Sequence, residues 1–230
     1  MGFRFRLYLE TVKAALRFFF LSLWAFCVPA QQNDWLVVPG ERLGPISSTV
    51  TRAGLERLLG KANIRDQKVD SGEGQEPATV VFPEKPGATL AIFWRDSGAI
   101  RDVIMCYQRD DHFCKWHTKE GVSLGTSLEQ LEKLNGRPFE FTPWGSDVGG
   151  NIVSWQGGRL AGVLGEGVNN RLWLTLDFPV SSHGFTRKQR SLLDEIDALK
   201  RGPLSSDLAV RQLQPVVSGM PLVVMRKMEP

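Results

Sequence analysis

The stretch Gly121-Val-Ser-Leu-Gly-Thr-Ser-Leu-Glu-Gln-Leu-Glu-Lys-Leu-Asn-Gly-Arg-Pro138 decides how this chain is expected to fold. Apolar residues recur within it every three positions and so share one helix face; they are Leu128, Leu131 and Leu134. Gly136 then supplies a left-handed C-cap, and Pro138 prevents the helix from resuming. The stretch predicts a short amphipathic helix that needs tertiary packing to persist.

The start of this helix has two candidate caps, Thr126 and Ser127. A hydroxyl oxygen of either residue can accept a hydrogen bond from a backbone N–H of the first turn. Glu129 follows Thr126 by three residues, which predicts a capping box between these two residues.

A fainter copy of the stretch runs from Gly44 to Gly60, as Gly-Pro-Ile-Ser-Ser-Thr-Val-Thr-Arg-Ala-Gly-Leu-Glu-Arg-Leu-Leu-Gly. Aligning Gly60 with Gly136 gives an offset of 76 residues, 136 minus 60. Each copy is followed by an apolar strand and a glycine-containing turn, at 90–98 and 151–158. We therefore predict an α+β fold built from tandem duplicated helix-plus-antiparallel-sheet units with a C-terminal helical extension.

The repeat pattern sets the predicted boundaries: a first unit at 31–117, a second at 118–180, and a C-terminal helix with a closing strand at 181–230. The polar, glycine-containing stretch 65–78 predicts an exposed loop. Apolar stretches predict strands, among them 34–38, 99–107, 139–141, 160–164 and 171–178.

Residues 1–30 have the pattern of a secretory signal peptide, with a basic start, an apolar run of 11 residues at 18–28 and cleavage after Ala30. Eleven residues are too few to span a bilayer, which needs about 20. The alternative is an uncleaved anchor at 7–28, which Lys13 and Arg17 interrupt. We expect an exported protein, periplasmic or secreted, with no stable membrane span after cleavage.

The charge balance of the expected mature chain is neutral. The whole chain has 28 basic and 25 acidic residues, and removing the leader takes away four and one of them, which leaves 24 of each. A neutral chain without a basic cluster lacks the electrostatic footprint of nucleic-acid binding. We therefore expect no nucleic-acid partner.

Cleavage would leave two cysteines, Cys106 and Cys114, which predict a disulfide in an oxidising compartment. The alternative is a redox or metal-sensing module at 106–117, in which His112 and His117 join Cys114 as ligands. Export disfavours that alternative because a thiolate does not persist in an oxidising compartment. The sequence predicts no cofactor.

The loop 142–150 is the best candidate for a binding site. Trp144 belongs to a residue type that is enriched at binding hot spots. Asp147 accompanies it, and Gly149 and Gly150 permit positive φ and close approach of the backbone. In the alternative, Trp144 folds back over the core and Asp147 satisfies the amides of the turn.

Two resemblances extend this interpretation. The helix stretch resembles the repeat of the beta-lactamase inhibitor protein and of outer-membrane assembly lipoproteins, although Asn135 precedes the glycine and Ala62 replaces the proline in the first copy. Most of the mature chain is similar to a family of uncharacterised bacterial exported proteins. The residues that carry this similarity are 38–40, 44–46, 72–74, 125–129, 134–139, 155–158 and 205–215. The first resemblance implies exported binding modules, and the second implies export without an assigned activity.

Catalytic motifs such as G-x-S-x-G, G-K-[ST] after a glycine-rich loop and H-E-x-x-H do not occur in the sequence. We therefore expect a non-catalytic binding protein of the bacterial cell envelope, with an envelope protein or another periplasmic component as its partner. The alternative is a hydrolytic enzyme that uses dispersed carboxylates such as Asp147 and Glu73.

Overall fold

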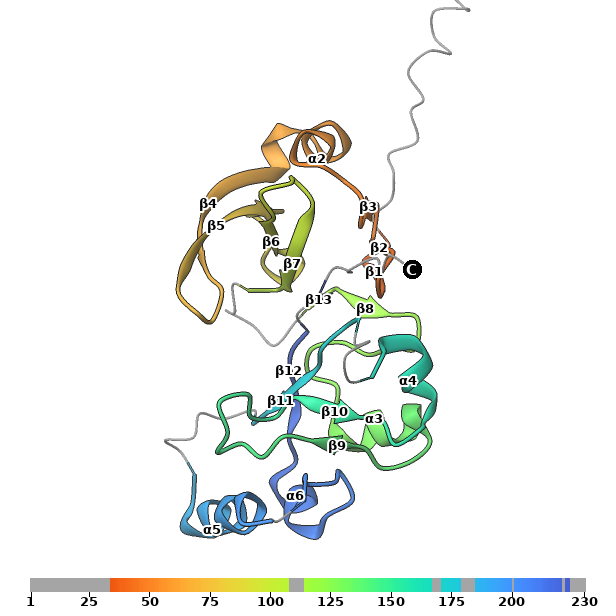
Figure 1. Ribbon diagram of the computed structural model, residues 1–230, viewed down its shortest axis with the longest axis vertical. Helices are drawn as coiled ribbons and strands as arrows, with labels where there is room; N and C mark the ends of the chain where they lie inside the picture. The colour runs from red at the N-terminus through yellow and green to blue at the C-terminus, as the bar shows by residue number, and fades with distance from the viewer. Residues whose placement is uncertain are drawn as a thin grey trace, which may run out of the picture. The chain divides into compact units, whose positions relative to one another are not determined.

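The computed structural model of the protein describes residues 34–107, 114–166, 171–178, 185–199, 201–220 and 222–223 (Figure 1). These residues form helices and mostly antiparallel sheets, which confirms the predicted α+β class. The helices are α2 (Arg52–Leu59), η2 (Lys61–Asn63), η3 (Pro86–Ala88), α3 (Leu128–Asn135), α4 (Arg159–Leu164), α5 (Arg187–Asp197) and α6 (Leu208–Leu213). The predicted signal peptide at 1–30 lies outside the described residues.

The strands pair into one five-stranded sheet and three smaller sheets. The large antiparallel sheet has the order β13-β7-β6-β5-β4, from β4 (Ile64–Asp70), β5 (Gln75–Val81), β6 (Leu90–Trp94), β7 (Ile100–Met105) and β13 (Leu222–Val223). A second sheet joins β1 (Leu36–Val38), β2 (Arg42–Leu43), β3 (Ile46–Ser47) and β8 (His117–Thr118). The remaining pairs are β9 (Glu140–Phe141) with β10 (Ile152–Ser154) and β11 (Thr175–Asp177) with β12 (Val216–Gly219).

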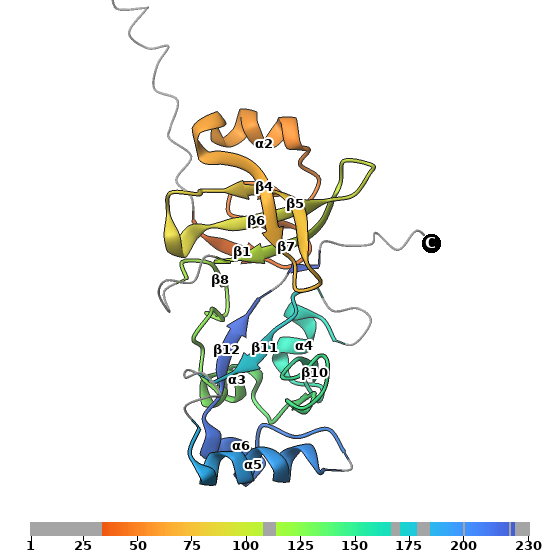
Figure 2. The ribbon, with the colours of Figure 1, turned by 90° about the vertical axis from the view of Figure 1, so that its left-hand side faces the viewer.

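The prediction of a loop at 65–78 was wrong, because this segment forms most of the β4–β5 hairpin (Figure 2). The two strands pair along their whole length, from Ile64 opposite Val81 to Asp70 opposite Gln75. β4 is an edge strand of its sheet and most of its side chains are exposed, so its sequence is polar. Strand signals that rest on apolar alternation are weak in such a segment.

Both faces of the large sheet are apolar where the strands meet. One face belongs to the main core through residues such as Ile92 and Val103. Leu55 of α2 is part of the same core. The other face carries a smaller buried cluster that consists of Val69, Ala78, Val80, Ala91 and Phe93. This sheet is therefore buried on both sides at its centre.

The helices α2 and α3 match the predicted duplication in position. Each has 8 residues, and Arg52 and Leu128, their first residues, are 76 apart, as 128 minus 52. Thr51 and Ser127 cap them, and Gly136 ends α3 in the left-handed conformation with φ of 83°. The next elements along the chain differ, since α2 leads into η2 and the long strand β4, whereas α3 leads into the short strand β9. The duplication itself stays a prediction.

The predicted capping box was placed one residue too early. Ser127 is the cap, and its hydroxyl accepts a hydrogen bond from the backbone N–H of Gln130. The side chain of Gln130 in turn accepts from the N–H of Ser127 at 3.0 Å. Thr126 is buried and its hydroxyl instead accepts from the N–H of Ser123.

The predicted strand at 160–164 was also wrong, because these residues belong to helix α4. The reason is a tertiary cap: Oδ1 of Asn135, at the end of α3, accepts a hydrogen bond from the N–H of Leu160 at 3.2 Å. Gly158 allows this approach, since a Cβ at that position would lie 2.0 Å from the same Oδ1. A cap that comes from 25 residues upstream leaves no local sequence signal.

The C-terminal segment contributes to two sheets. Thr186 caps α5 with a capping box to Gln189, and the helix ends at Asp197. β12 pairs with β11, and Leu222 of β13 pairs with Val103 of β7 at the edge of the large sheet. The predicted closing strand is thus confirmed at Leu222–Val223.

The predicted disulfide has the geometry it needs. The Sγ atoms of Cys106 and Cys114 lie 2.07 Å apart, and their Cα atoms lie 5.9 Å apart. Cys106 is buried at the end of β7, where its N–H donates to Thr89 O. The bond therefore ties the segment before β8 to the large sheet.

Reduction of this disulfide is expected to lower the free energy of unfolding by about 2–3 kcal/mol, because the bond closes a short loop in the unfolded chain. Denaturant titration with and without a reductant measures the effect. The Cys106→Ser/Cys114→Ser variant should have the stability of the reduced wild type and should not respond to the reductant. A reductant effect of equal size in this variant would contradict the assignment.

A chain of side-chain hydrogen bonds links α2 to the large sheet. Trp94 Nε1 donates to Thr79 Oγ1 at 2.8 Å, and Thr79 donates to Asp66 at 2.6 Å. Arg52 of α2 binds both oxygens of the same carboxylate. The hydrogen bonds from Arg52 and Thr79 hold the pKa of Asp66 below its usual range.

The Asp66→Asn variant is expected to lose about 1 kcal/mol of stability at pH 7, a small loss because the Asp66 side chain is 62% exposed. Since folding lowers the pKa of Asp66, this stabilisation is present above the ordinary carboxyl pKa of about 4 and is lost as the pH falls through the folded value. Urea titrations at several pH values should show wild type and variant converging in acid. A constant difference down to acid pH would contradict this.

Candidate functional site

The predicted binding loop places Trp144 against the core. Its ring lies between Phe141 and Phe178, with centroid distances of 4.8 and 4.7 Å. Its Nε1 donates to Leu176 O at 2.9 Å. The indole therefore packs against the core and donates a hydrogen bond. This arrangement matches the alternative in which Trp144 folds back over the core.

The two glycines of the loop allow this packing. A Cβ at Gly149 would lie 2.6 Å from Trp144 O, and a Cβ at Gly150 would lie 2.1 Å from Leu176 O. Asp147 is exposed at the tip of the loop. The structure thus brings Trp144, Gly149 and Gly150 together in a packed arrangement and leaves Asp147 in solvent.

The second predicted region, 106–117, is only partly described. His112 lies outside the described residues, and the sulfur of Cys114 is bonded to Cys106. Nδ1 of His117 lies 2.8 Å from Lys115 O. Within the described ranges, no group of three or more His, Cys, Asp or Glu residues has the arrangement of a metal site.

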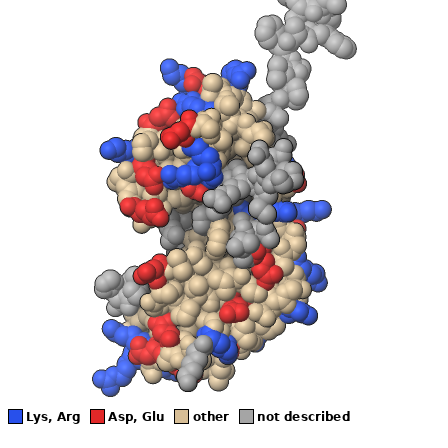
Figure 3. All heavy atoms as spheres, viewed as in Figure 1, with Lys and Arg blue, Asp and Glu red and all other residues tan. Residues whose placement is uncertain are grey.

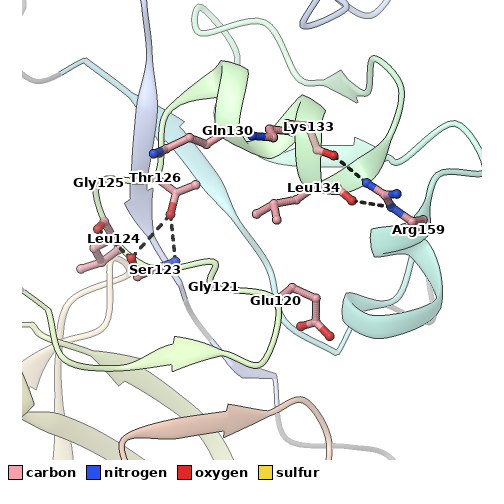
Figure 4. Close-up of a pocket in the computed structure, with 10 residues that line it drawn as sticks. All are labelled: Glu120, Gly121, Ser123, Leu124, Gly125, Thr126, Gln130, Lys133, Leu134 and Arg159. Carbon is pink, nitrogen blue, oxygen red and sulfur yellow. Dashed lines mark hydrogen bonds between the residues drawn. The ribbon is translucent and has the colours of Figure 1, made fainter.

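A groove of about 840 Å³ lies beside α3 (Figure 4). Figure 4 shows α3 on one side, the Glu120–Gly121 turn opposite it, the 123–126 loop at one end and Arg159 of α4 at the other. Its lining residues are Glu120, Gly121, Ser123, Leu124, Gly125, Thr126, Gln130, Lys133, Leu134 and Arg159. We name this cavity the α3 groove.

Backbone and hydroxyl hydrogen bonds hold the 123–126 loop in place. Ser123 N–H donates to Thr126 Oγ1 at 2.9 Å, and Thr126 N–H donates back to Ser123 O at 3.2 Å. Gly125, which has φ of 84°, donates its N–H to Val217 O of β12. This end of the α3 groove is therefore tied to a neighbouring strand.

Arg159 joins α4 to the C-terminal end of α3. Its Nε donates to Leu134 O at 2.9 Å and its Nη2 donates to Lys133 O at 2.6 Å. The last carbonyls of a helix lack intrahelical partners, and a cation stabilises that negative end of the helix dipole. These two bonds fix the guanidinium, while Nη1 has no hydrogen-bond acceptor among the described residues.

Glu120 contributes an incompletely paired carboxylate. Its Oε2 is buried and accepts no hydrogen bond from any residue that the structure describes. An acceptor left in this state costs roughly 1–3 kcal/mol, and native proteins keep few of them. The atom has almost no accessible surface, so a molecule in the α3 groove would not contact it.

Two further polar side chains of α3 have free donors. Lys133 is exposed and forms no ion pair with a described acidic residue. Gln130 uses its Oε1 in the capping box and leaves its Nε2 without a described acceptor. Leu124 and Leu134 pack partly against the core and supply apolar surface between these polar groups. The arrangement offers cationic donors, one carboxylate and an apolar surface to a ligand.

Sequence reasoning missed this site. Leu134 and Lys133 belong to the stretch that predicted a helix, and nothing in the sequence singled out Glu120 or Arg159. The available signal was the charge of Glu120, which directly precedes the helix stretch, and of Lys133 within it. Glu73 and Asp147, the carboxylates of the enzyme alternative, do not line the α3 groove.

Comparison of the chain with protein-family models, with curated proteins and with solved structures finds no match. Among the described residues, no helix has the length and apolar content needed to cross a bilayer. Figure 3 shows basic and acidic side chains interspersed on the visible face.

Proposed function

We propose that this protein is an exported, non-catalytic binding protein of the bacterial cell envelope, and that the α3 groove is its binding surface. The observation that carries the proposal is the α3 groove itself, an open cavity of about 840 Å³ in which the exposed Lys133 and Arg159 lie beside the partly buried Leu124 and Leu134. A partner with a complementary acidic and apolar surface would fit this lining.

Export is supported by the pattern of the first 30 residues and by the Cys106–Cys114 pair, since disulfides persist in oxidising compartments. A binding role is supported by the exposed Lys133 and by the fixed Arg159, whose donors at the same groove include some without an acceptor among the described residues. The expected partner is an envelope protein or another periplasmic component.

Export predicts a specific mature mass. Protein recovered from the periplasm is expected to begin at Gln31 and to weigh two hydrogens less than the chain with free thiols. Intact mass spectrometry before and after thiol alkylation measures both. A retained leader would contradict cleavage, and alkylated cysteines without prior reduction would contradict the oxidised state.

The binding role is tested by a chemical crosslinking pull-down from the native envelope. The Lys133→Glu variant reverses an exposed charge in the α3 groove, and Lys61→Glu, in the exposed helix η2, is the matched control. We expect one partner to be captured by wild type and by the control and to be lost with Lys133→Glu. Equal capture by all three proteins, or none by wild type, would overturn the proposed binding surface.

A further inference from the structure

From the open edge of the large sheet, we infer that β4 pairs in antiparallel orientation with β4 of a second copy of this chain. The two five-stranded sheets then join into one continuous sheet, with a twofold axis at Gln67. This contact does not involve the α3 groove, so the inference goes beyond the proposed function and does not depend on it.

β4 has a long edge that faces no other strand of the sheet. It is the last strand in the order, and its other edge pairs with β5 over all seven residues (Figure 1). Just outside the two ends of β4, Phe82 N–H donates to Asn63 O and Ser71 N–H donates to Gly74 O.

These two bonds fix which backbone groups point to the open edge. Hydrogen-bonded pairs alternate with non-hydrogen-bonded pairs along an antiparallel ladder. Positions 63 and 71 bond toward the β5 side, so the odd-numbered residues of β4 direct their backbone groups to β5 and the even-numbered ones direct theirs outward. The outward-directed residues are Ile64, Asp66, Lys68 and Asp70.

The outward backbone groups are available for pairing. Ile64 N–H donates to Lys61 O, and the other backbone groups of this edge have no hydrogen-bond partner among the described residues. Natural proteins commonly keep edge strands short or interrupt them with a bulge, because an exposed edge pairs with other strands. β4 pairs with β5 in one continuous register over seven residues, so its open edge is long and regular.

The charges of β4 favour a second copy in one register. With the twofold axis at Gln67, Asp66 lies directly opposite Lys68 of the partner subunit, and this pair occurs twice. A register centred on position 66 places two aspartates opposite each other, and one centred on position 68 does the same with two lysines. Like charges in directly opposite positions are destabilising.

Both charged side chains are accessible for this contact. Lys68 is exposed, and no described residue forms an ion pair with it. The Asp66 side chain is 62% exposed, and Arg52 holds its carboxylate in place. Exposed ion pairs contribute little affinity, so the backbone hydrogen bonds supply the affinity and the charges set the register.

Sedimentation equilibrium of the full mature chain measures the dimer Kd. We expect a reversible dimer with a Kd below about 1 mM. Lys68→Glu places a second carboxylate opposite Asp66 and should raise the Kd at least about tenfold, a ratio that corresponds to about 1.4 kcal/mol. Lys188→Glu makes the same charge change at an exposed position of α5 and should leave the Kd unchanged.

A cysteine at position 67 tests the register. The two copies of this position form a non-hydrogen-bonded pair at the twofold axis, with Cα atoms about 4.5 Å apart, close enough for a disulfide. With oxidised glutathione as the oxidant, Gln67→Cys should give a disulfide-linked dimer. Arg65→Cys should not, because position 65 lies opposite Val69 of the partner subunit. The native Cys106 and Cys114 are already bonded to each other.

Three results would overturn the inference. A chain that stays monomeric up to roughly 1 mM has no dimer of this kind, since a Kd of about 1 mM is already weak. A Kd that Lys68→Glu leaves unchanged removes the β4 edge from the contact. Equal crosslinking of Gln67→Cys and Arg65→Cys contradicts the register. Circular dichroism confirms that each variant is folded, and the pull-down at the α3 groove tests the proposed function separately.

Discussion

The Asn135→Ala variant is expected to lose about 3–5 kcal/mol of unfolding free energy, because three hydrogen bonds end at this one buried side chain. Asn135 is only 1% exposed. Its Nδ2 donates to Arg137 O at 3.0 Å and to Trp155 O at 2.9 Å, and its Oδ1 accepts from Leu160 N–H. The variant leaves these backbone groups without their partner inside the protein.

The control for this prediction is Asn63→Ala. Asn63 is partly buried, and its Nδ2 donates to Leu59 O at 2.7 Å. The loss of a single bond of this kind is expected to cost about 0.5–1.5 kcal/mol. Urea titration of both variants measures the difference, and equal costs would show that Asn135 does not organise the junction between α3 and α4.

The effect of Asn135 bears on the α3 groove. Asn135 connects the end of α3 to the first turn of α4, and α4 carries Arg159. Loss of this connection is expected to weaken the two bonds from Arg159 to α3 and so to broaden the NMR signals of the groove. Asn135 departs from the repeat pattern of the helix stretch. The structure gives the reason, because its side chain caps α4 from the end of α3.

The Gly150→Ala variant is expected to cost at least about 3 kcal/mol, from backbone strain and a steric clash together. Gly150 has φ of 79°, and an added Cβ would lie 2.1 Å from Leu176 O and 3.0 Å from Trp144 Nε1. The backbone would have to move, which would break the hydrogen bond from the indole of Trp144 to Leu176 O.

Gly98→Ala isolates the part of this cost that comes from the clash. Gly98 has nearly the same φ, 78°, but its added Cβ meets nothing within 4 Å. Its cost is therefore expected to be the conformational penalty alone, about 1–2 kcal/mol. Thermal unfolding monitored by tryptophan fluorescence compares the two variants, and similar losses would contradict the packed arrangement of the 142–150 loop.

The sequence predicted those parts of the fold that rest on local signals. The α3 stretch has its leucine periodicity and its glycine stop, and the C-terminal segment contains the expected helix, α5. The disulfide followed from the number of cysteines and the leader. The helix signals depend on residues within a few positions of one another, and the disulfide depends on a count of cysteines, so a single sequence contains both kinds of information.

Features fixed by tertiary contacts were missed. α4 begins where Asn135 caps it from 25 residues upstream, and the polar edge strand β4 is held by its pairing with β5. The α3 groove has the same cause, because Glu120, Lys133 and Arg159 come from three separate elements and converge only in the fold. The 142–150 loop was predicted as a binding site because its residue types are common in binding sites. Only the structure shows that the Trp144 indole donates a hydrogen bond to Leu176 O.

Site-specific photo-crosslinking is the decisive test of whether the α3 groove is the binding surface. A photoreactive amino acid replaces Gln130, which lines the α3 groove, in one variant and Lys61 in the other, both exposed positions, and each is irradiated in the native envelope. We predict a single crosslinked partner from position 130 and none from position 61. Crosslinks from both positions in equal yield, or from neither, would contradict a binding role for the α3 groove.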